Sequence, residues 1–205
     1  FVGVIRQEHL VLQESFVNDN LSGIIRVVEM MTAALKAGNK IMIFGNGGSA
    51  ADAQHLAAEF VNRFLIERPP LPAIALSTDT SIITSIGNDY DFSEIFSKQI
   101  RALGQPGDVV WGISTSGRSR NVYKGLEQAK KMGLTTFALT GKDGGDIAGI
   151  ADYSLNVASE STPRIQEVHI TLGHVLCQMV DLKLFQRPDL NEGQVVKMFD
   201  HGEKD

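Results

Sequence analysis

The sequence predicts an α/β fold: a three-layer αβα sandwich with a five-stranded parallel sheet. Short apolar runs alternate with segments whose apolar residues follow helical spacing, and short polar turns join the two. This alternation is typical of a parallel sheet covered by helices on both faces. Two of the turns that follow strands are rich in glycine or hydroxyl residues, and such folds bind ligands at that place.

Two amphipathic helices are predicted before the first strand, over residues 6–18 and 22–37. Asn20 or Ser22 is a candidate cap for the second helix, and Gly38 is a candidate end. Both helices precede any strand that they could cover. We therefore expect them to pack on a neighbouring subunit, in oligomerisation, as well as on the core. Packing within the chain alone is the alternative.

The predicted strands are short apolar runs bounded by glycine, proline or polar residues. They lie at 41–44, 73–76, 109–113, 134–139 and 153–157. Five helices are predicted after the first strand. One follows that strand directly, the second ends near residue 86, the third covers 92–103, the fourth ends at residue 132, and the fifth runs from Pro163 to about Phe185. The segments 87–91 and 140–145 are predicted polar turns.

A single domain over 1–185 is expected, with the N-terminal helices over 1–38, the α/β core over 39–185 and a polar tail over 186–205. The net charge of −5 and the absence of a basic run argue against non-specific nucleic-acid binding, although not against a small phosphorylated ligand. Cys177 is the only cysteine, so no intrachain disulfide can form. We find no signal peptide or membrane-spanning run, and expect a cytoplasmic protein.

The first predicted strand runs directly into a glycine turn and an alanine-rich helix, Gly45 to Glu59. Backbone N–H groups at a helix start lack helical partners, and the helix dipole adds partial positive charge there. His55 and Glu59 stand four residues apart and so project from one face of this helix. A solvated helix face with an exposed histidine is the alternative interpretation.

Four hydroxyl residues follow the third predicted strand, at a strand-to-helix junction. Hydroxyls and free backbone N–H groups can together satisfy phosphate oxygens without a lysine. Helix capping is the alternative, but one cap needs one hydroxyl, so the cluster favours phosphate. Neither turn has the spacing of a nucleotide P-loop or of a dinucleotide fingerprint. The four residues are Ser114, Thr115, Ser116 and Ser119.

The closing helix carries several polar residues in an otherwise apolar segment. His174 lies among leucine and valine, and an imidazole in apolar company needs a partner. His169 is a candidate for a structural or exposed role.

Five strings of the sequence resemble, in order, the sugar isomerase (SIS) domain and within it the bacterial phosphoheptose isomerases: FGNGGSAADAQHLAAEF, GNDYDF, GISTSGRSRNV, LTGKDGG and RIQEVHITLGH. The resemblance covers roughly residues 1–185 and implies a flavodoxin-like sheet. It implies a homotetramer that converts sedoheptulose 7-phosphate to D-glycero-D-manno-heptose 7-phosphate, which supplies heptose for lipopolysaccharide synthesis.

The resemblance also implies the residues of the site. It makes Glu59 the base and His174 the acid. It places the substrate against Asn46, Gly47, Gly48, Ser49, Glu59, Asn88, Asp89, Ser114, Thr115, Ser116, Ser119 and Gln166. It implies one zinc ion per subunit, held by His55, Glu59, Gln166 and His174.

The implied chemistry is consistent with these residue types. Aldose–ketose isomerisation moves a proton between adjacent carbons through an enediol, so it needs a base, an acid near the oxygens and stabilisation of the enediolate. Zinc can polarise the carbonyl, and histidine with a carboxylate is a suitable ligand set. Within this site we expect Ser114–Ser119 to hold the phosphate and Asn46–Gly48 to hold the sugar oxygens.

Gln166 and His174 are eight residues apart on one predicted helix. That spacing is about 12 Å along the axis and roughly 80° around it. Both side chains cannot comfortably reach one ion from the same helix. We therefore expect an active site between subunits, with one of the two residues supplied by a neighbour.

Three other functions remain open. A replication-initiator-associating protein shares the resemblance but binds a protein partner, and it has other residue types where this chain has Glu59 and His174. An SIS regulator that only senses a sugar phosphate is the second. An isomerase or etherase for another sugar phosphate is the third, because sugar length is selected by pocket shape rather than by a motif.

Overall fold

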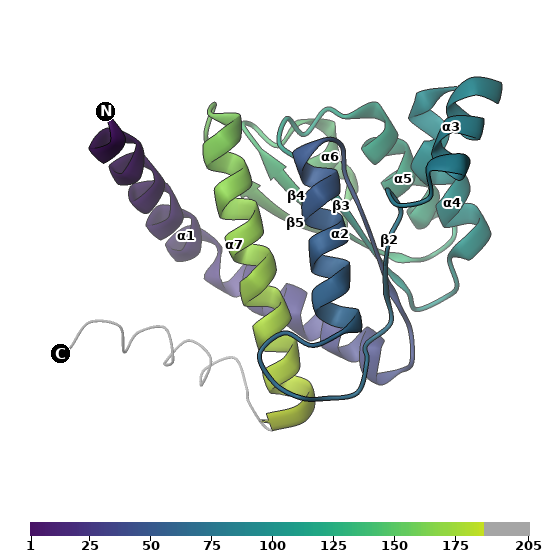
Figure 1. The fold of residues 1–205 in the computed structure, drawn as a ribbon, viewed down its shortest axis with the longest axis horizontal. Helices are drawn as coiled ribbons and strands as arrows, with labels where there is room; N and C mark the ends of the chain where they lie inside the picture. Colours follow the sequence, from purple (N-terminus) through teal and green to yellow (C-terminus); the bar gives the residue numbers. More distant parts are fainter. Residues whose placement is uncertain (187–205) are drawn as a thin grey trace.

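The computed structural model describes residues 1–186 and shows a five-stranded, all-parallel sheet in the order β2-β1-β3-β4-β5 (Figure 1). The register is regular, with Ile41 of β1 opposite both Ala73 of β2 and Val109 of β3. The predicted sheet and its flavodoxin-like order are confirmed. The strands are β1 (Ile41–Phe44), β2 (Ala73–Ala75), β3 (Val109–Ser114), β4 (Thr135–Gly141) and β5 (Tyr153–Val157).

Helices cover both faces of the sheet, which confirms the three layers. On one face lie α1 (Val2–Lys36), α2 (Gly48–Val61) and α7 (Thr162–Asp181), which bury Ile43 and Trp111 of the sheet. The opposite core contains Phe44 and Val110. The helices of this second face are α3 (Thr80–Asp89), α4 (Ile95–Leu103), α5 (Arg120–Lys131) and α6 (Gly145–Ile150), with a 3₁₀ turn at Phe92–Glu94 before α4.

The prediction of two N-terminal helices is wrong, because α1 is one continuous helix of 35 residues. The side chain of Asn20, a predicted cap, instead donates to the carbonyl of Phe16 inside the helix. Neither glycine nor proline lies between the two predicted segments, so nothing breaks the hydrogen-bond ladder. The predicted end at Gly38 is confirmed by its φ of 82°. The first turns of α1 extend away from the sheet (Figure 1).

Two predicted turns are partly regular structure. Helix α3 continues to Asp89, past the predicted end at Ile86, because Tyr90 N still donates to Ile86 O. At its other end the helix is capped by Asp79, whose side chain accepts from Ile82 N. Strand β4 extends through Gly141, and the short helix α6 after it was not predicted because its GDIAGI segment is too short to show a period.

Helix α7 begins at Thr162, with Pro163 in its first turn as predicted. It ends at Asp181, earlier than predicted, and passes into a π-helical turn over Leu182–Gln186. The predicted polar tail after Gln186 lies outside the described residues. Within residues 1–186 no helix combines the length and the apolar character needed to cross a membrane.

The strand order places a topological switch between β1 and β3. From β1 the chain moves to β2 on one side, and from β3 it moves to β4 and β5 on the other. Helices α2 and α5, which follow these two strands, therefore leave toward opposite faces. The carboxyl ends of β1 and β3 thus flank a crevice of the kind in which such folds bind ligands.

Candidate active site

The turn after β1 is built so that its backbone remains accessible. Gly47 has a φ of 53°, a conformation that favours glycine, and it precedes the first residue of α2, Gly48. The side chain of Asn46 forms a reciprocal pair of 2.8 Å hydrogen bonds with Asn121 of α5. This pair bridges the switch between β1 and β3. It fixes the turn that leads into the helix start.

Gln166 of α7 lies directly over this helix start. A Cβ at Gly48 would collide with its side-chain amide. The absence of a side chain at Gly48 therefore lets α7 approach the N-terminus of α2. The amide of Gln166 and the free N–H groups of α2 thus line the same point.

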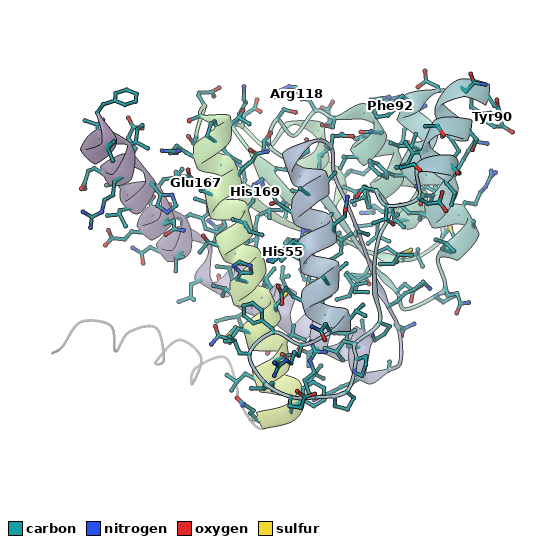
Figure 2. All side chains as sticks on the ribbon, viewed as in Figure 1. His55, Tyr90, Phe92, Arg118, Glu167 and His169 are labelled. Carbon is teal, nitrogen blue, oxygen red and sulfur yellow. The ribbon has the colours of Figure 1, made fainter. Side chains whose placement is uncertain are left out.

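Three side chains of the predicted proton-transfer site converge between α2 and α7. His55 Nε2 lies 2.8 Å from His174 Nε2 and 3.4 Å from Glu59 Oε1. The ring of His174 is stacked on Phe64, with the ring centroids 5.4 Å apart. The His55 side chain is 46% exposed and that of Glu59 21%, so a ligand can reach this cluster. Figure 2 shows His55 between the two helices.

The hydroxyl loop after β3 is organised by its own side chains. Ser114 is buried at the end of the strand and donates to Ser119 Oγ at 3.0 Å. Its hydroxyl also lies 3.5 Å from that of Ser116. Although Ser119 occupies the N-cap position of α5, its side chain makes no capping hydrogen bond. The capping interpretation therefore does not account for these hydroxyls. Of the first N–H groups of α5, that of Val122 donates to Asn121 Oδ1 at 2.9 Å, and none is capped by Ser119.

Asn88 and Asp89 are at the C-terminal end of α3 rather than in a loop. Both are exposed, and Asn88 Nδ2 donates to Asp89 Oδ1 at 2.8 Å. In the part of the chain that the structure describes, neither residue hydrogen-bonds to a predicted site residue outside this pair. The structure thus brings His55, Glu59 and His174 together, and Gln166 with Gly48, but leaves this pair apart.

His169 links the closing helix to the sheet. It is buried, and its Nε2–H donates to the carbonyl oxygen of Thr140 on β4 at 2.9 Å. Burial, only partly offset by this hydrogen bond, lowers the pKa of His169 to about 4. This histidine is therefore neutral at pH 7 and has a structural role. It holds α7 against the strand that pairs with β3, Ser114 being opposite Thr140.

Comparisons with known proteins identify the family. Residues 6–141 match the SIS domain. The phosphoheptose isomerase of Thermodesulfovibrio yellowstonii is 57% identical over 182 residues, which are 89% of this chain and 90% of the relative. The chain belongs to the phosphoheptose isomerase family. The members of this family are SIS-domain enzymes.

Solved structures of the family have the same fold. A phosphoheptose isomerase from Neisseria gonorrhoeae is 44% identical with a TM-score of 0.83, covering 88% of this chain and 96% of that one. One from Francisella tularensis is 37% identical with a TM-score of 0.86, covering 89% and 97%. The fold predicted from the resemblance is thus confirmed over most of the chain.

Sequence reasoning missed Asp52, which the structure places beside His55 in the cluster between α2 and α7. It lies on α2 three residues before His55, and its Oδ2 is buried without a hydrogen-bond partner. Burial raises the pKa of the Asp52 carboxyl, and the nearby His55 opposes this shift. Its spacing of three and seven residues from His55 and Glu59 on one helix was the signal available in the sequence.

Arg68 was also missed, and no sequence signal marks it. Its guanidinium is buried, pairs with Asp181 of α7 at 3.0 Å and donates to the carbonyls of Glu59 and Phe60 at the end of α2. Helix-end carbonyls lack helical partners, so this cation satisfies them. Burial raises the pKa of Asp181, and Arg68 opposes that shift. The pair ties the helix of Glu59 to the helix of His174.

The donor chemistry between α2 and α7 suits zinc, although the geometry in one chain is not that of a finished site. Two imidazoles and a carboxylate are common zinc ligands. However, two nitrogens on one tetrahedral ion lie about 3.3 Å apart, whereas His55 Nε2 and His174 Nε2 share a 2.8 Å hydrogen bond. Among residues 1–186 no group of three His, Cys, Asp or Glu side chains is arranged to hold a metal ion.

Proposed function

We propose that this chain is a phosphoheptose isomerase that converts sedoheptulose 7-phosphate to D-glycero-D-manno-heptose 7-phosphate. The observation that carries the proposal is the convergence of Glu59 and His174 on His55, within one chain and open to a ligand. The names of relatives that match most of the chain support a heptose phosphate as substrate. We further propose that the reaction is cytoplasmic and supplies heptose for lipopolysaccharide.

The mechanism assigns each predicted residue a role. The Glu59 carboxylate removes the proton from C1 of the ketose, which gives an enediol, and returns a proton to C2 to form the aldose. His174 donates to and accepts from the oxygens on C1 and C2, so that no full charge accumulates on them. The hydroxyl loop Ser114–Ser119 holds the phosphate. Asn46 to Ser49, Asn88, Asp89 and Gln166 hold the sugar.

We also propose one zinc ion per subunit, held by His55, Glu59, Gln166 and His174. When bound, such an ion polarises a substrate carbonyl. In the described chain Gln166 lies against Gly48, whereas His174 lies against His55. This separation supports the proposal that a neighbouring subunit supplies one of the two residues. We accordingly propose a homotetramer with active sites between subunits, in which the exposed first turns of α1 take part.

The test is turnover of sedoheptulose 7-phosphate by the wild type, Glu59→Gln and His174→Gln, with and without a chelator. Loss of a positioned base or acid lowers rates by about 10²–10⁴-fold, so we expect kcat to fall by that factor in each variant. The matched control is Glu127→Gln, since Glu127 is an exposed residue of α5 paired with Lys131, and it should keep full activity.

Each outcome bears on a separate part of the proposal. Full turnover by Glu59→Gln would contradict the assignment of the base. Absence of turnover by the wild type would favour the alternative of a non-catalytic SIS protein that binds a replication-initiator partner or senses a sugar phosphate. Metal content by mass spectrometry, before and after chelation, tests one zinc per subunit. The molar mass of the protein in solution, measured by light scattering, tests the tetramer.

A further inference from the structure

The loop that follows β3 and the loop that follows β4 are interlocked through their backbones. Gly117, with a φ of 65°, lies so close to Gly144 that a Cβ on it would overlap the Gly144 carbonyl. A Cβ on Gly145 would likewise overlap the carbonyl of Gly117. Ile147 N donates to that same Gly117 carbonyl at 3.1 Å. The hydroxyl loop therefore rests on the turn after β4 rather than standing alone in solvent.

The turn after β4 is itself held in an uncommon conformation. Lys142 is the only residue other than glycine with a positive φ, 58°, in the described chain. Its carbonyl accepts from Asn156 Nδ2 at 3.0 Å, while Asn156 Oδ1 accepts from Thr140 at 2.9 Å. Such a conformation persists where the surroundings determine it. Strand β5 thus fixes the turn on which the hydroxyl loop rests.

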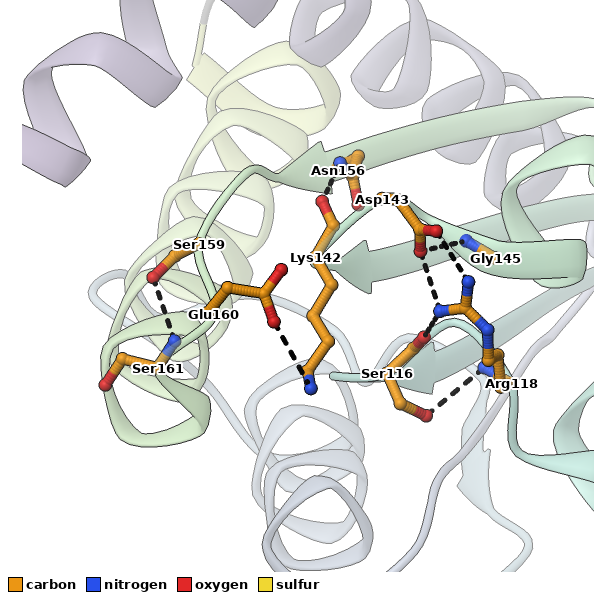
Figure 3. A network of polar contacts seen from close by, with 9 residues as sticks. All are labelled: Ser116, Arg118, Lys142, Asp143, Gly145, Asn156, Ser159, Glu160 and Ser161. Carbon is orange, nitrogen blue, oxygen red and sulfur yellow. Dashed lines mark hydrogen bonds and ion pairs between the residues drawn. The ribbon is translucent and has the colours of Figure 1, made fainter.

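Arg118 joins the two loops by its side chain. Its two terminal nitrogens donate to the two carboxylate oxygens of Asp143 at 2.7 and 2.5 Å, and one of them also donates to Ser116 O at 3.2 Å (Figure 3). Asp143 Oδ1 in turn accepts from Gly145 N at 3.2 Å. The guanidinium holds the pKa of Asp143 down, to about 2, so the pair is charged at pH 7.

Arg118 also reaches the hydroxyl of Ser116, because its backbone N–H donates to Ser116 Oγ at 3.2 Å. The carbonyl and the hydroxyl of Ser116 therefore both accept from Arg118. The fork of the guanidinium is occupied by the carboxylate. The groups left for a phosphate are the hydroxyls and the N–H groups at the start of α5.

We propose that the Arg118–Asp143 pair is a positioning device that holds the Ser114–Ser119 loop in its phosphate-binding form, and that Arg118 is not itself a phosphate ligand. The proposal rests on the proposed function of this loop. A phosphate-binding loop without a cation gains affinity from preorganisation, because hydroxyl groups that are already oriented toward the ligand lose less conformational entropy on binding. The packed backbones of the two loops support the hydroxyl loop, and the Arg118–Asp143 ion pair, which we call the clamp, holds it in place.

The test measures the dissociation constant of inorganic phosphate for the full chain by calorimetry, together with KM and kcat for sedoheptulose 7-phosphate. The variants are Arg118→Ala, Asp143→Ala, the double variant and Arg118→Lys. Exposed ion pairs contribute up to about fivefold to an equilibrium. We therefore expect each alanine variant to weaken phosphate binding and raise KM by about three- to fivefold, with kcat unchanged.

The double variant should bind phosphate no more weakly than either single variant, because both remove the same clamp. Arg118→Lys should behave as Arg118→Ala does, because an ammonium cannot form the bidentate fork. The matched control is Lys131→Ala together with Glu127→Ala, which remove an exposed pair of α5 and should leave phosphate affinity unchanged.

Two results would overturn the proposal. Tighter phosphate binding by Asp143→Ala, with weaker binding by Arg118→Ala, would make Arg118 a direct ligand that Asp143 restrains. Wild-type affinity in all variants would make the pair an ordinary surface contact. Phosphate binding is measured without turnover. If the wild-type protein binds phosphate but does not isomerise the sugar phosphate, the proposed function is contradicted, and the phosphate affinities of the variants still decide the role of the Arg118–Asp143 pair.

Discussion

The hydroxyl loop and the histidine cluster are built in opposite ways. The loop consists of neighbouring residues after one strand, with Ser114 and Ser119 hydrogen-bonded to each other. The cluster joins His55 and His174, which are 119 positions apart on two helices. Local hydrogen bonds and close backbone packing organise the loop. The cluster depends on how α2 and α7 pack.

This difference separates binding from chemistry in physical terms. A change in the packing of α2 and α7 should alter proton transfer while leaving the affinity for phosphate intact. A change within the loop should do the reverse. His169 is one contact between the two regions, since it joins α7 to β4 next to the strand that carries the loop.

The largest expected effect comes from Arg68→Met, which leaves Asp181 buried without its partner. Breaking a buried ion pair costs about 3–5 kcal/mol, so we expect the free energy of unfolding in urea to fall by that amount. At a temperature where the variant is folded, kcat should fall while inorganic phosphate binds as in the wild type.

The control for Arg68→Met is the double variant with Asp181→Leu, which should regain most of the stability because no unpaired charge remains. Equal losses of kcat and of phosphate affinity in the folded single variant would show that the two regions are not independent.

A smaller effect is expected from protonation of His169. Its pKa is about 4 in the folded protein against 6.5 for the unpaired group. The unfolded state therefore binds more protons between these values, so stability is complete above pH 6.5 and is lost as pH falls toward 4. Between pH 7 and pH 5 this histidine should cost about 2 kcal/mol.

The measurement for His169 is urea unfolding at both pH values. His169→Gln, whose amide can still donate to Thr140 O, should remove the contribution of this residue to the pH slope. An unchanged slope in His169→Gln would show that other groups account for the acid sensitivity.

The smallest effect is expected from Ser119→Ala in the loop. One hydrogen bond to a charged group contributes about 1.5 kcal/mol or more, so KM for the sugar phosphate should rise roughly tenfold while kcat stays within twofold. Ser81→Ala, which removes an exposed hydroxyl of α3, is the control. A drop in kcat without a change in KM would place Ser119 in the chemistry rather than in binding.

The sequence predicted the sheet and the hydroxyl loop because both are local. Apolar runs such as Ile41–Phe44 mark strands directly, and four hydroxyls in six residues are visible without a structure. Gln166 lies against Gly48 and His174 against His55, and the expectation that a neighbouring subunit supplies one of them stays a prediction.

Features that depend on tertiary packing were not predicted. Asn20 suggested a break in α1, whereas its side chain bonds within the helix. Arg68 acts through backbone carbonyls of Glu59 and Phe60, which carry no sequence signal. The clamp of Arg118 and Asp143 joins residues 25 positions apart, and each alone is an ordinary surface residue.

The continuous helix α1 has a consequence for synthesis on the ribosome. Its buried side chains, among them Ile24, Val28 and Met31, pack against β5 and α7, which are made more than a hundred residues later. Until α7 has left the exit tunnel, this apolar stripe lacks its native cover. The chain therefore carries an unburied surface through most of its translation, which is the period in which chaperones act on nascent proteins.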